Sequence, residues 1–405
     1  MTAGVLAVLI PTRNRSDLAT AAVRSVTESG DANIRVIVSD NSTDVAETRK
    51  LEQFHSNLGD PRLSVIRPKA PLSMTKHWDW AIEQVLADRS VTHALVLADR
   101  MMFKRGALDA VVRVVADYPD DVIMYADDKV IDDDEPVAVV KVRWRGVLAR
   151  VSTRRLLQMT SQGQLFPVPR MLNSVAPRAA LETVRRRFGT IFGSASPDFC
   201  FAYRCLAVTD TVLYYDRAPV FHYALRVSNG FAFARGERTA ASEDYLRTIG
   251  EPPTAFAPVP EIITPNNAVI SEYCRVREET ASDKFPPMNR DRYLQLISAD
   301  IARIRVPELR RQMESALAAH GRPASRPSLL TFLKRVLSLP AAGPMRRFWR
   351  FLSRTANLNP PGDAPITFAN SDQAIAHMRT VPRRRHMTSL HLRVLFGTYE
   401  RLGRY

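Results

Sequence analysis

Near the start of the chain an apolar run stops at a proline, and two arginines follow it. The run covers residues 5–10 and continues into Pro11, Thr12, Arg13, Asn14 and Arg15. A buried strand that ends in such a turn presents backbone donors and positive charge, which a diphosphate needs. We therefore predict that Pro11, Thr12, Arg13 and Arg15 contact a diphosphate. The alternative is that Pro11 only ends the strand and both arginines are solvated.

Two further apolar runs also end in polar side chains. Residues 34–39 lead into Asp40, Asn41 and Ser42, and residues 94–98 lead into Asp99 and Arg100. Ligands of open α/β sheets bind beyond the carboxyl ends of the strands, so these ends predict one ligand cleft. Asp40 is the candidate for binding a base or ribose, with Asn41 and Ser42 beside it. Capping of the next helix is the alternative role of Asp40.

The composition is that of a folded globular protein, with 45% hydrophobic and 24% charged residues among 405. The formal net charge is +15, but residues 301–405 hold 19 Lys or Arg against 5 Asp or Glu, so residues 1–300 are nearly neutral. This basic tail lacks interleaved aromatic stacking platforms, and we expect no nucleic-acid partner. Three cysteines are too few for a disulfide framework or a four-ligand zinc site.

No apolar run approaches the roughly 18 residues that cross a bilayer, and the N-terminus lacks the basic segment of a signal peptide. We expect a cytoplasmic protein. Two basic, apolar stretches at 329–337 and 345–352 either lie on an anionic inner membrane surface or pack on the preceding domain, and residues 383–385 add positive charge. The first option would make the protein peripheral on the membrane.

Helical periodicity recurs between the strands, at 16–29, 45–55, 73–87 and 106–118. This alternation predicts parallel βαβ units, and so an α/β sheet flanked by helices. We expect the acidic segment 127–136 to turn at the surface before a strand at 137–142. Residues 146–210 read as helical with interruptions, and 212–215 and 219–223 as short strands. The predicted units are a domain at 1–250, a proline-rich connector at 251–285 and a basic helical extension at 286–405.

Four segments in this order resemble the family 2 glycosyltransferases, inverting enzymes of the GT-A fold that use nucleotide-diphosphate sugars. The matching segments are 10–15, 40–44, 97–99 and 196–199, and the resemblance covers about residues 3–240. It implies a GT-A fold and transfer of a sugar, most often from a uridine or deoxythymidine donor, to a hydroxyl acceptor. The acceptor would be a saccharide or a lipid-linked saccharide of a cell-envelope polysaccharide or glycolipid.

Asp99 falls where the resembling family carries an acidic metal motif. Two aspartates there bind a divalent cation that neutralises the leaving diphosphate. Here Asp99 is followed by Arg100 and Met101. One carboxylate can still hold Mg²⁺ or Mn²⁺ together with diphosphate oxygens, so we expect Asp99 to be the metal ligand. The alternatives are that Arg100 neutralises the charge directly, or that Asp99 only pairs with a cation.

Asp198 is the candidate general base. Inversion requires the acceptor hydroxyl to lose its proton as it attacks, and one carboxylate opposite the leaving group suffices. The resemblance places the family's catalytic carboxylate at this position. The alternative is that Asp198 is the N-cap of a helix at 199–206.

His222, Ser228 and Asn229 form a later polar group. The resemblance implies a loop that closes over the sugar or diphosphate, or contacts the acceptor. A turn built on Asn229 and Gly230 explains the same residues without a ligand. Processive relatives carry a Gln-x-x-Arg-Trp signature and membrane spans. Here Arg143 and Trp144 lack the glutamine and precede Asp198, so we expect a single-transfer enzyme. The alternative is a catalytically silent protein that binds nucleotide sugars or serves as a scaffold.

Overall fold

The structure is a computed structural model that describes residues 4–132, 135–140, 147–193, 195–321, 366–380, 396 and 399–404. Within these ranges twelve strands join one sheet, whose main path runs β12-β8-β10-β6-β9-β4-β1-β2-β3. Strands β5, β7 and β11 pair off this path. The strands are β1 (Val5–Thr12), β2 (Ile34–Asp40), β3 (Leu63–Ile66), β4 (Val91–Val96), β5 (Met101–Phe103), β6 (Ile123–Ile131), β7 (Val137–Val140), β8 (Val147–Ser152), β9 (Ser174–Pro177), β10 (Thr211–His222), β11 (Ile366–Phe368) and β12 (Glu400–Arg404).

Six strands of this path run in the same direction. Strands β3, β2, β1 and β4 pair in parallel, and β6 pairs in parallel with β10. The short β9 is antiparallel to both β4 and β6, so it gives these two neighbours a common direction. Their carboxyl ends therefore share one edge of the sheet, where Thr12 of β1 lies in register with Asp40 of β2. This confirms the predicted α/β fold class with a mostly parallel sheet flanked by helices.

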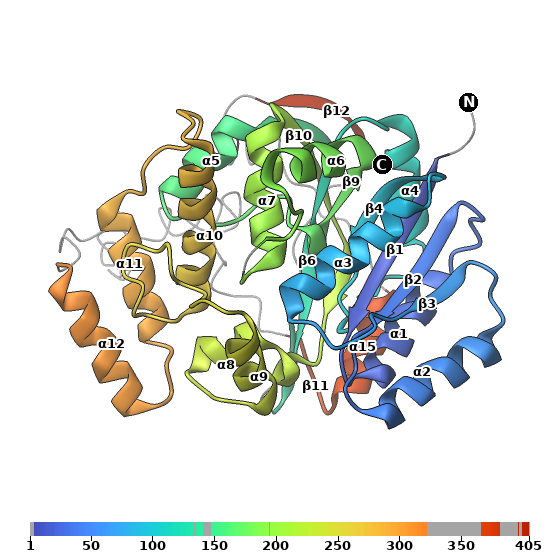
Figure 1. Ribbon diagram of the computed structural model, residues 1–405, viewed down its shortest axis with the longest axis horizontal. Helices are drawn as coiled ribbons and strands as arrows, with labels where there is room; N and C mark the ends of the chain where they lie inside the picture. The colour runs from blue at the N-terminus through green and yellow to red at the C-terminus, as the bar shows by residue number, and fades with distance from the viewer. Residues whose placement is uncertain are drawn as a thin grey trace, which may run out of the picture.

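The helices and the two short 3-10 turns flank the sheet, and helices alternate with strands from β1 to β4 (Figure 1). Their bounds are α1 (Ser16–Thr27), α2 (Val45–Leu58), α3 (Met74–Ala87), α4 (Ala107–Asp117), α5 (Thr153–Ser161), η1 (Met171–Asn173), α6 (Arg178–Phe188), α7 (Pro197–Val208), η2 (Leu225–Val227), α8 (Asn229–Arg235), α9 (Ala240–Thr248), α10 (Pro265–Thr280), α11 (Arg290–Ile301), α12 (Pro307–Ala319) and α15 (Ser371–Thr380). The first four lie where the 3.6-residue periodicity predicts them. In α4, for example, Leu108, Val111 and Val115 lie on one buried face.

Three local predictions between residues 127 and 223 are wrong. The acidic segment does not turn at the surface at its start, because Asp127 and Asp128 are buried within β6. Both are paired with cations, Asp128 with Lys104 and Asp127 with Arg170, which makes their burial tolerable. The segment 146–210 includes the strands β8 and β9 as well as helices. The two short strands expected at 212–223 are one strand, β10.

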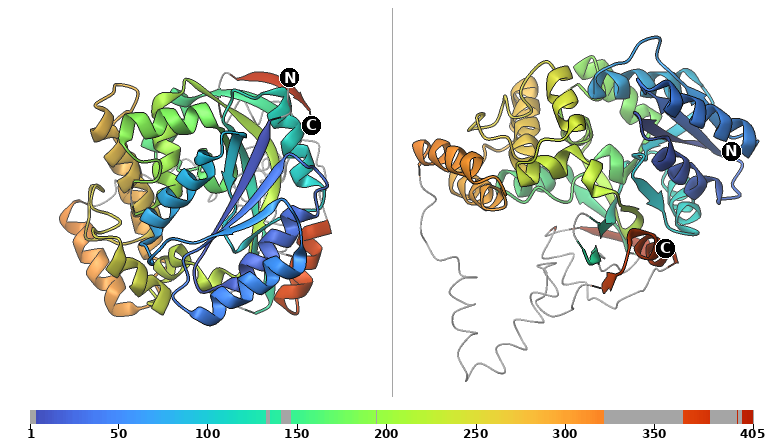
Figure 2. Two further views of the ribbon diagram at one scale, coloured as in Figure 1. Left: turned by 45° about the vertical axis from the view of Figure 1, so that its right-hand side comes forward. Right: turned by 90° about the horizontal axis from the view of Figure 1, so that it is seen from below.

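The C-terminal part is helical at α11 and α12, which lie far from β1–β3 (Figures 1 and 2), but it then returns to the sheet. Strand β11 pairs with β7, and β12 pairs with β8. Between them, α15 packs against α1, where Ala374 and Met378 lie in one cluster with Leu18. The fully helical extension that we predicted therefore misses two strands, because their partners β7 and β8 are distant in sequence.

The proline-rich segment also contributes to the main core. Helix α10, within the predicted connector, buries Val269, Tyr273 and Val276 in the same hydrophobic cluster as β1. A second cluster lies between α10, α11 and α12 and includes Ile270, Ile297 and Leu317. The domain boundaries stay a prediction, but the segment at 265–280 packs on the sheet domain rather than spanning a gap.

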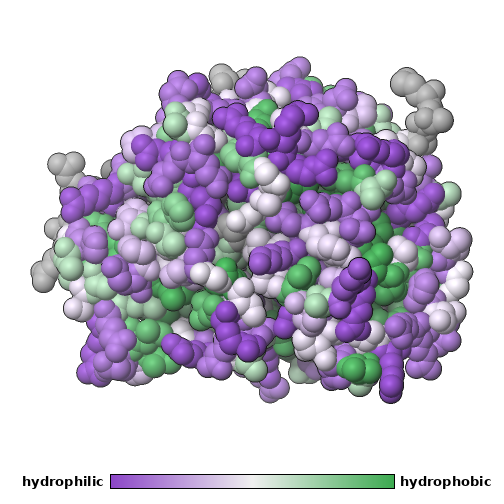
Figure 3. Space-filling model, in the orientation of Figure 1, coloured by the Kyte–Doolittle hydropathy of each residue, from purple (hydrophilic) through white to green (hydrophobic). Residues whose placement is uncertain are grey.

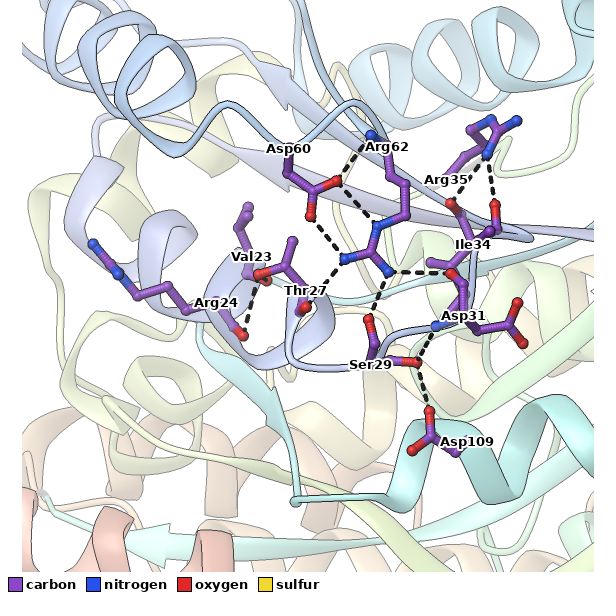
Figure 4. Close-up of polar contacts among 11 residues, drawn as sticks. Val23, Arg24, Thr27, Ser29, Asp31, Ile34, Arg35, Asp60, Arg62 and Asp109 are labelled. Carbon is purple, nitrogen blue, oxygen red and sulfur yellow. Dashed lines mark hydrogen bonds and ion pairs between the residues drawn. The ribbon is translucent and has the colours of Figure 1, made fainter.

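Arg62 links two loops at the edge of the sheet where the parallel strands begin. This edge is opposite the one that carries Thr12 and Asp40. Arg62 donates hydrogen bonds to the backbone carbonyls of Ser29 (2.6 Å) and Thr27 (3.1 Å) (Figure 4). Its guanidinium also pairs with Asp60 at 2.7 Å. The ion pair lowers the pKa of Asp60 and raises that of Arg62. This arginine therefore has a structural role, joining the loops that precede β2 and β3.

The face seen in Figure 3 is covered mainly by hydrophilic side chains, with small hydrophobic groups between them. In the part of the chain that the structure describes, no helix combines the length and apolarity needed to cross a bilayer. The basic stretches at 329–337, 345–352 and 383–385 lie outside the described residues, as do Arg143 and Trp144.

Candidate active site

Asp99 lies just beyond β4, at the edge where the polar strand ends meet. Its Oδ2 accepts a hydrogen bond from the Thr12 hydroxyl at 3.0 Å. The same oxygen lies 2.9 Å from Nε of Arg15, and the Asp99 side chain is only 2% exposed. Thr12 and Arg15 from the first predicted segment thus meet the carboxylate of Asp99 from another, and Arg15 is an ion-pair partner of Asp99.

The turns after β1 and β2 are tied to each other through Asn14. Asn14 adopts a left-handed backbone conformation, with φ of 54°, which asparagine tolerates better than most residues. Its backbone N–H donates to the Ser42 hydroxyl at 2.8 Å, and its side-chain oxygen accepts from the N–H of Thr43 at 2.8 Å. Asn41 continues the link, because its N–H donates to the Thr12 carbonyl at 2.9 Å. The two turns therefore form one rigid rim.

The carboxylate of Asp40 is buried and holds its own loop. Its Oδ1 accepts from the Ser42 N–H at 2.8 Å, and its Oδ2 accepts from the Thr48 hydroxyl at 2.9 Å. Arg67, which follows β3, lies 3.5 Å from the same Oδ2. The N-cap of α2 is Asp44, so Asp40 does not cap that helix. A hollow of about 300 Å³ lies beside it and is lined by Asp40, Thr48, Glu52, His55, Ser56, Val65 and Arg67.

Both predicted phosphate-binding arginines contact the segment that includes the predicted lid. Nη1 of Arg15 donates to the carbonyl of Val227 in η2 at 3.2 Å. Arg13 lies 3.1 Å from Asp244 of α9 and donates to the carbonyl of Leu72 at 3.0 Å. Ser228 is the N-cap residue of α8, without a side-chain cap hydrogen bond, and Asn229 begins that helix. The structure thus brings residues 227–244 against the rim after β1.

Asp198 is the second residue of α7, after Pro197, and Ser196 is the N-cap. The interpretation of Asp198 as an N-cap is therefore wrong. Its Oδ2 lies 3.8 Å from Nη1 of Arg170, and the side chain is 16% exposed. Burial raises the pKa of Asp198 above its usual value, while Arg170 and the backbone N–H groups at the start of α7 oppose this rise. A carboxyl with a raised pKa is suited to accept a proton near neutral pH.

His222 is buried at the end of β10 rather than in a loop. Its Nε2 lies 2.9 Å from Oδ2 of Asp127, and its Nδ1 lies 3.4 Å from Nη1 of Arg100. Burial lowers the pKa of His222 to about 4, although Asp127 opposes the change. The neutral imidazole therefore donates from Nε2 to Asp127, which leaves Nδ1 to accept from Arg100. His222 is thus a link between two charged groups.

Arg170 completes a continuous polar chain to Asp198. Its Nη2 donates to Oδ1 of Asp127 at 3.1 Å, and its Nη1 faces Asp198. Burial by itself raises the pKa of Asp127, but Arg170 and His222 together bring it below its usual range. The rings of Phe166 and Phe199 flank the guanidinium at 5.6 and 5.3 Å. The order is Arg100, His222, Asp127, Arg170, Asp198, and so the candidate base is joined to Arg100, the residue after Asp99.

Four residues of this site were missed from the sequence, namely Arg67, Asp127, Arg170 and Asp244. Asp127 gave a misleading signal, because an acidic run ahead of a proline usually marks a surface turn. The available clue was that apolar residues stand on both sides of the acidic pair, at 122–126 and 130–131, as in one continuous strand. Arg170 and Asp244 lie in segments without a motif, and only tertiary contacts give them a place.

The donor set around Asp99 does not suit a divalent cation. Mg²⁺ and Mn²⁺ take several oxygen ligands, whereas the Asp99 Oδ2 is shared by a hydroxyl and a guanidinium. Arg100, the next residue, adds a second positive charge beside it. Among the described residues, no three His, Cys, Asp or Glu side chains gather as a metal site.

Solved structures of similar shape come from the S. aureus protein TarS. TarS 1–349 in complex with UDP-GlcNAc aligns at 14% identity with a TM-score of 0.44, covering 87% of this chain and 78% of that chain. TarS 1–349 in complex with UDP aligns at 14% identity with a TM-score of 0.41, covering 78% of this chain and 87% of that chain. A longer TarS chain aligns over 53% of its length, so this chain spans about half of it. No family model and no curated protein matches the sequence.

Proposed function

We propose that the protein is an inverting, non-processive glycosyltransferase of the GT-A type that takes its sugar from a nucleotide diphosphate. One observation carries the proposal. Arginines and Asp198, a partly buried carboxylate of raised pKa, come together in a single polar chain at the ends of β1, β4 and β10 and the start of α7. Positive charge on one side and a proton acceptor on the other are the two features that displacement at a sugar carbon requires.

In the proposed reaction the acceptor hydroxyl oxygen attacks the anomeric carbon of the sugar. The bond from that carbon to the diphosphate oxygen breaks, and its electron pair leaves with the diphosphate. The hydroxyl proton passes to Asp198. Arg15 and Arg100 face the diphosphate, and the rim of Pro11, Thr12 and Arg13 holds it from the β1 side. Attack opposite the leaving group inverts the anomeric centre.

The nucleoside belongs at the hollow beside Asp40. This hollow offers a guanidinium, a carboxylate and hydroxyls, which suit the donors and acceptors of a base and ribose. We assign the role of a lid to residues 227–244, because they contact both Arg13 and Arg15. The UDP and UDP-GlcNAc complexes of TarS make uridine nucleotides the first donors to test.

The deciding experiment compares the unmodified protein with Asp198→Asn. We expect transfer or slow hydrolysis of a radiolabelled nucleotide sugar to fall at least about 100-fold in the variant, since general base catalysis contributes about that factor or more. UDP affinity and thermal stability should stay within the error of the wild type. If the wild type binds nucleotide sugars but turns none over, the protein is the silent binding protein that we consider as the alternative.

Membrane attachment and location on the inner membrane face remain separate proposals, which rest on the basic stretches at 329–337 and 345–352 alone. Co-sedimentation of the full chain with vesicles that contain anionic lipid tests them. Binding that disappears at high salt or with neutral vesicles supports an electrostatic membrane contact, and equal recovery with both vesicle types at all salt concentrations contradicts it.

A further inference from the structure

Asp99, the expected metal ligand, already has a cationic partner. Arg15 lies 2.9 Å from its Oδ2, and Thr12 donates to the same oxygen at 3.0 Å. The Asp99 side chain is 2% exposed, whereas that of Arg15 is 32% exposed. The carboxylate is therefore buried beneath the guanidinium, and the guanidinium is the group that reaches toward solvent. A cation at this oxygen would have to replace Arg15.

Arg100 is held in a similar way from another strand. Its Nη1 lies 3.4 Å from Nδ1 of His222, which accepts because its Nε2 faces Asp127 at 2.9 Å. A backbone hydrogen bond also holds Arg100, because the N–H of Tyr223 donates to the carbonyl of Arg100 at 3.1 Å. Strand β10 thus fixes both the main chain and the side chain of Arg100.

The two guanidinium groups belong to one electrostatic cluster. The charges that act on Arg100 are those of Asp99, Arg15, Asp198 and Arg170. Each arginine thus has its own buried acceptor, Asp99 for Arg15 and His222 for Arg100. Neither acceptor uses all the donors of its guanidinium, because each arginine carries five N–H groups in a planar fork. The remaining N–H groups can bind phosphate oxygens in pairs.

We propose that Arg15 and Arg100 neutralise the departing diphosphate in place of a divalent cation, and that Asp99 and His222 are positioning residues for these two arginines. This inference rests on the proposed function, because it assigns the charge balance of the same reaction. As the bond between sugar and diphosphate breaks, the leaving oxygen gains one negative charge. The guanidinium groups stabilise that charge with N–H donors that are already in place, and no proton has to move to the leaving group.

The first test measures binding rather than turnover, by titration calorimetry of the full chain with UDP and with inorganic pyrophosphate. Each titration is made once with EDTA and once with excess MnCl₂. We expect UDP to bind with the same affinity, within about threefold, in both buffers. A Mn²⁺ requirement for UDP binding, lost in Asp99→Asn, would overturn the inference while leaving the proposed function intact. Pyrophosphate binding without UDP binding would support the arginine site and contradict the nucleotide donor, and no binding of either would overturn both.

The second test uses variants in EDTA. We expect Arg15→Met and Arg100→Met to lower UDP affinity by about 10- to 100-fold each, the usual range for a lost charge-assisted hydrogen bond. Arg15→Lys should recover part of that loss. Arg15 is partly exposed, so we expect Arg15→Met to fold. It therefore still tests the assignment if Arg100→Met does not fold. Affinity unchanged in Arg15→Met would refute the assignment.

Arg62→Met is the matched control. Arg62 is also an arginine paired with an aspartate, Asp60, but it lies at the opposite edge of the sheet. Its loss should lower the thermal midpoint without changing UDP affinity. For Asp99→Asn we expect a loss in EDTA that is smaller than that of Arg15→Met, because an amide oxygen still accepts from Arg15. His222→Gln should act on UDP affinity through Arg100, and the double variant His222→Gln, Arg100→Met should bind no more weakly than Arg100→Met alone.

Discussion

Replacement of Arg170 by methionine tests the polar chain where it reaches the candidate base. Nη1 of Arg170 lies 3.8 Å from Asp198, and both side chains are largely buried, at 13% and 16% exposed. The positive charge favours the ionised form of Asp198, while burial disfavours it. Methionine keeps contact with the rings of Phe166 and Phe199 but has no charge. The pKa of Asp198 should therefore rise in Arg170→Met, and the base should be protonated over a wider range of pH.

The size of the effect follows from Coulomb's law. At 3.8 Å and an effective dielectric constant of about 20, two unit charges interact by about 4 kcal/mol. At about 1.4 kcal/mol for each factor of ten, this is nearly a thousandfold change in the ratio of ionised to protonated Asp198. Water that enters the vacated space screens part of it. We expect kcat/KM at pH 6 to fall by about 10- to 1,000-fold, with recovery as the pH rises.

The assay is the pH profile of kcat/KM for sugar transfer, measured from pH 5 to pH 9. In Arg170→Met the acidic limb should move to higher pH, and Arg170→Lys should move it less. Arg204→Met is the control, because Arg204 is a buried arginine in α7, the helix that carries Asp198, and it is paired with Glu279 and packed on Phe188. It should lower stability without moving the limb. A profile for Arg170→Met that is only lower than that of the wild type, with an unmoved limb, would refute the role given to Arg170.

Three further predictions concern stability. Arg62→Met should lower the free energy of unfolding by about 2–4 kcal/mol in urea titrations, because the part-buried carbonyls of Thr27 and Ser29 lose a charged donor. A change of less than about 0.5 kcal/mol would contradict the structural role of Arg62. Burial lowers the pKa of His77 to about 4, so the folded state binds fewer protons than the unfolded state, and stability is lost as the pH falls from about 6.5 toward 4. This amounts to about 2 kcal/mol between pH 7 and pH 5, and that part of the slope should vanish in His77→Gln. Gly193→Ala should lower the free energy of unfolding by about 1–3 kcal/mol, because the added Cβ would lie 2.5 Å from the guanidinium of Arg204. An unchanged melting temperature would show that Arg204 moves aside without loss of stability.

Much of the parallel sheet and its polar rim could be predicted from local patterns. Apolar runs that stop at Pro11, Asp40 and Asp99 indicate strands, and the helical periodicity between them indicates βαβ units, whose strands end at one edge. The predicted meeting of Thr12 with Asp99 follows from this alternation alone. Local periodicity is a property of neighbouring residues, so one sequence is enough to show it.

Only the tertiary structure decided what the carboxylates do. Asp99 faces Arg15, Asp40 holds its own loop, and Asp127 is buried between His222 and Arg170 instead of exposed in a turn. Likewise, β11 and β12 complete the sheet from the far end of the chain. Each of these pairings joins residues that are distant in sequence. The charge and the role of a buried carboxyl depend on which cation lies within about 4 Å, and that distance is set by packing, not by sequence order.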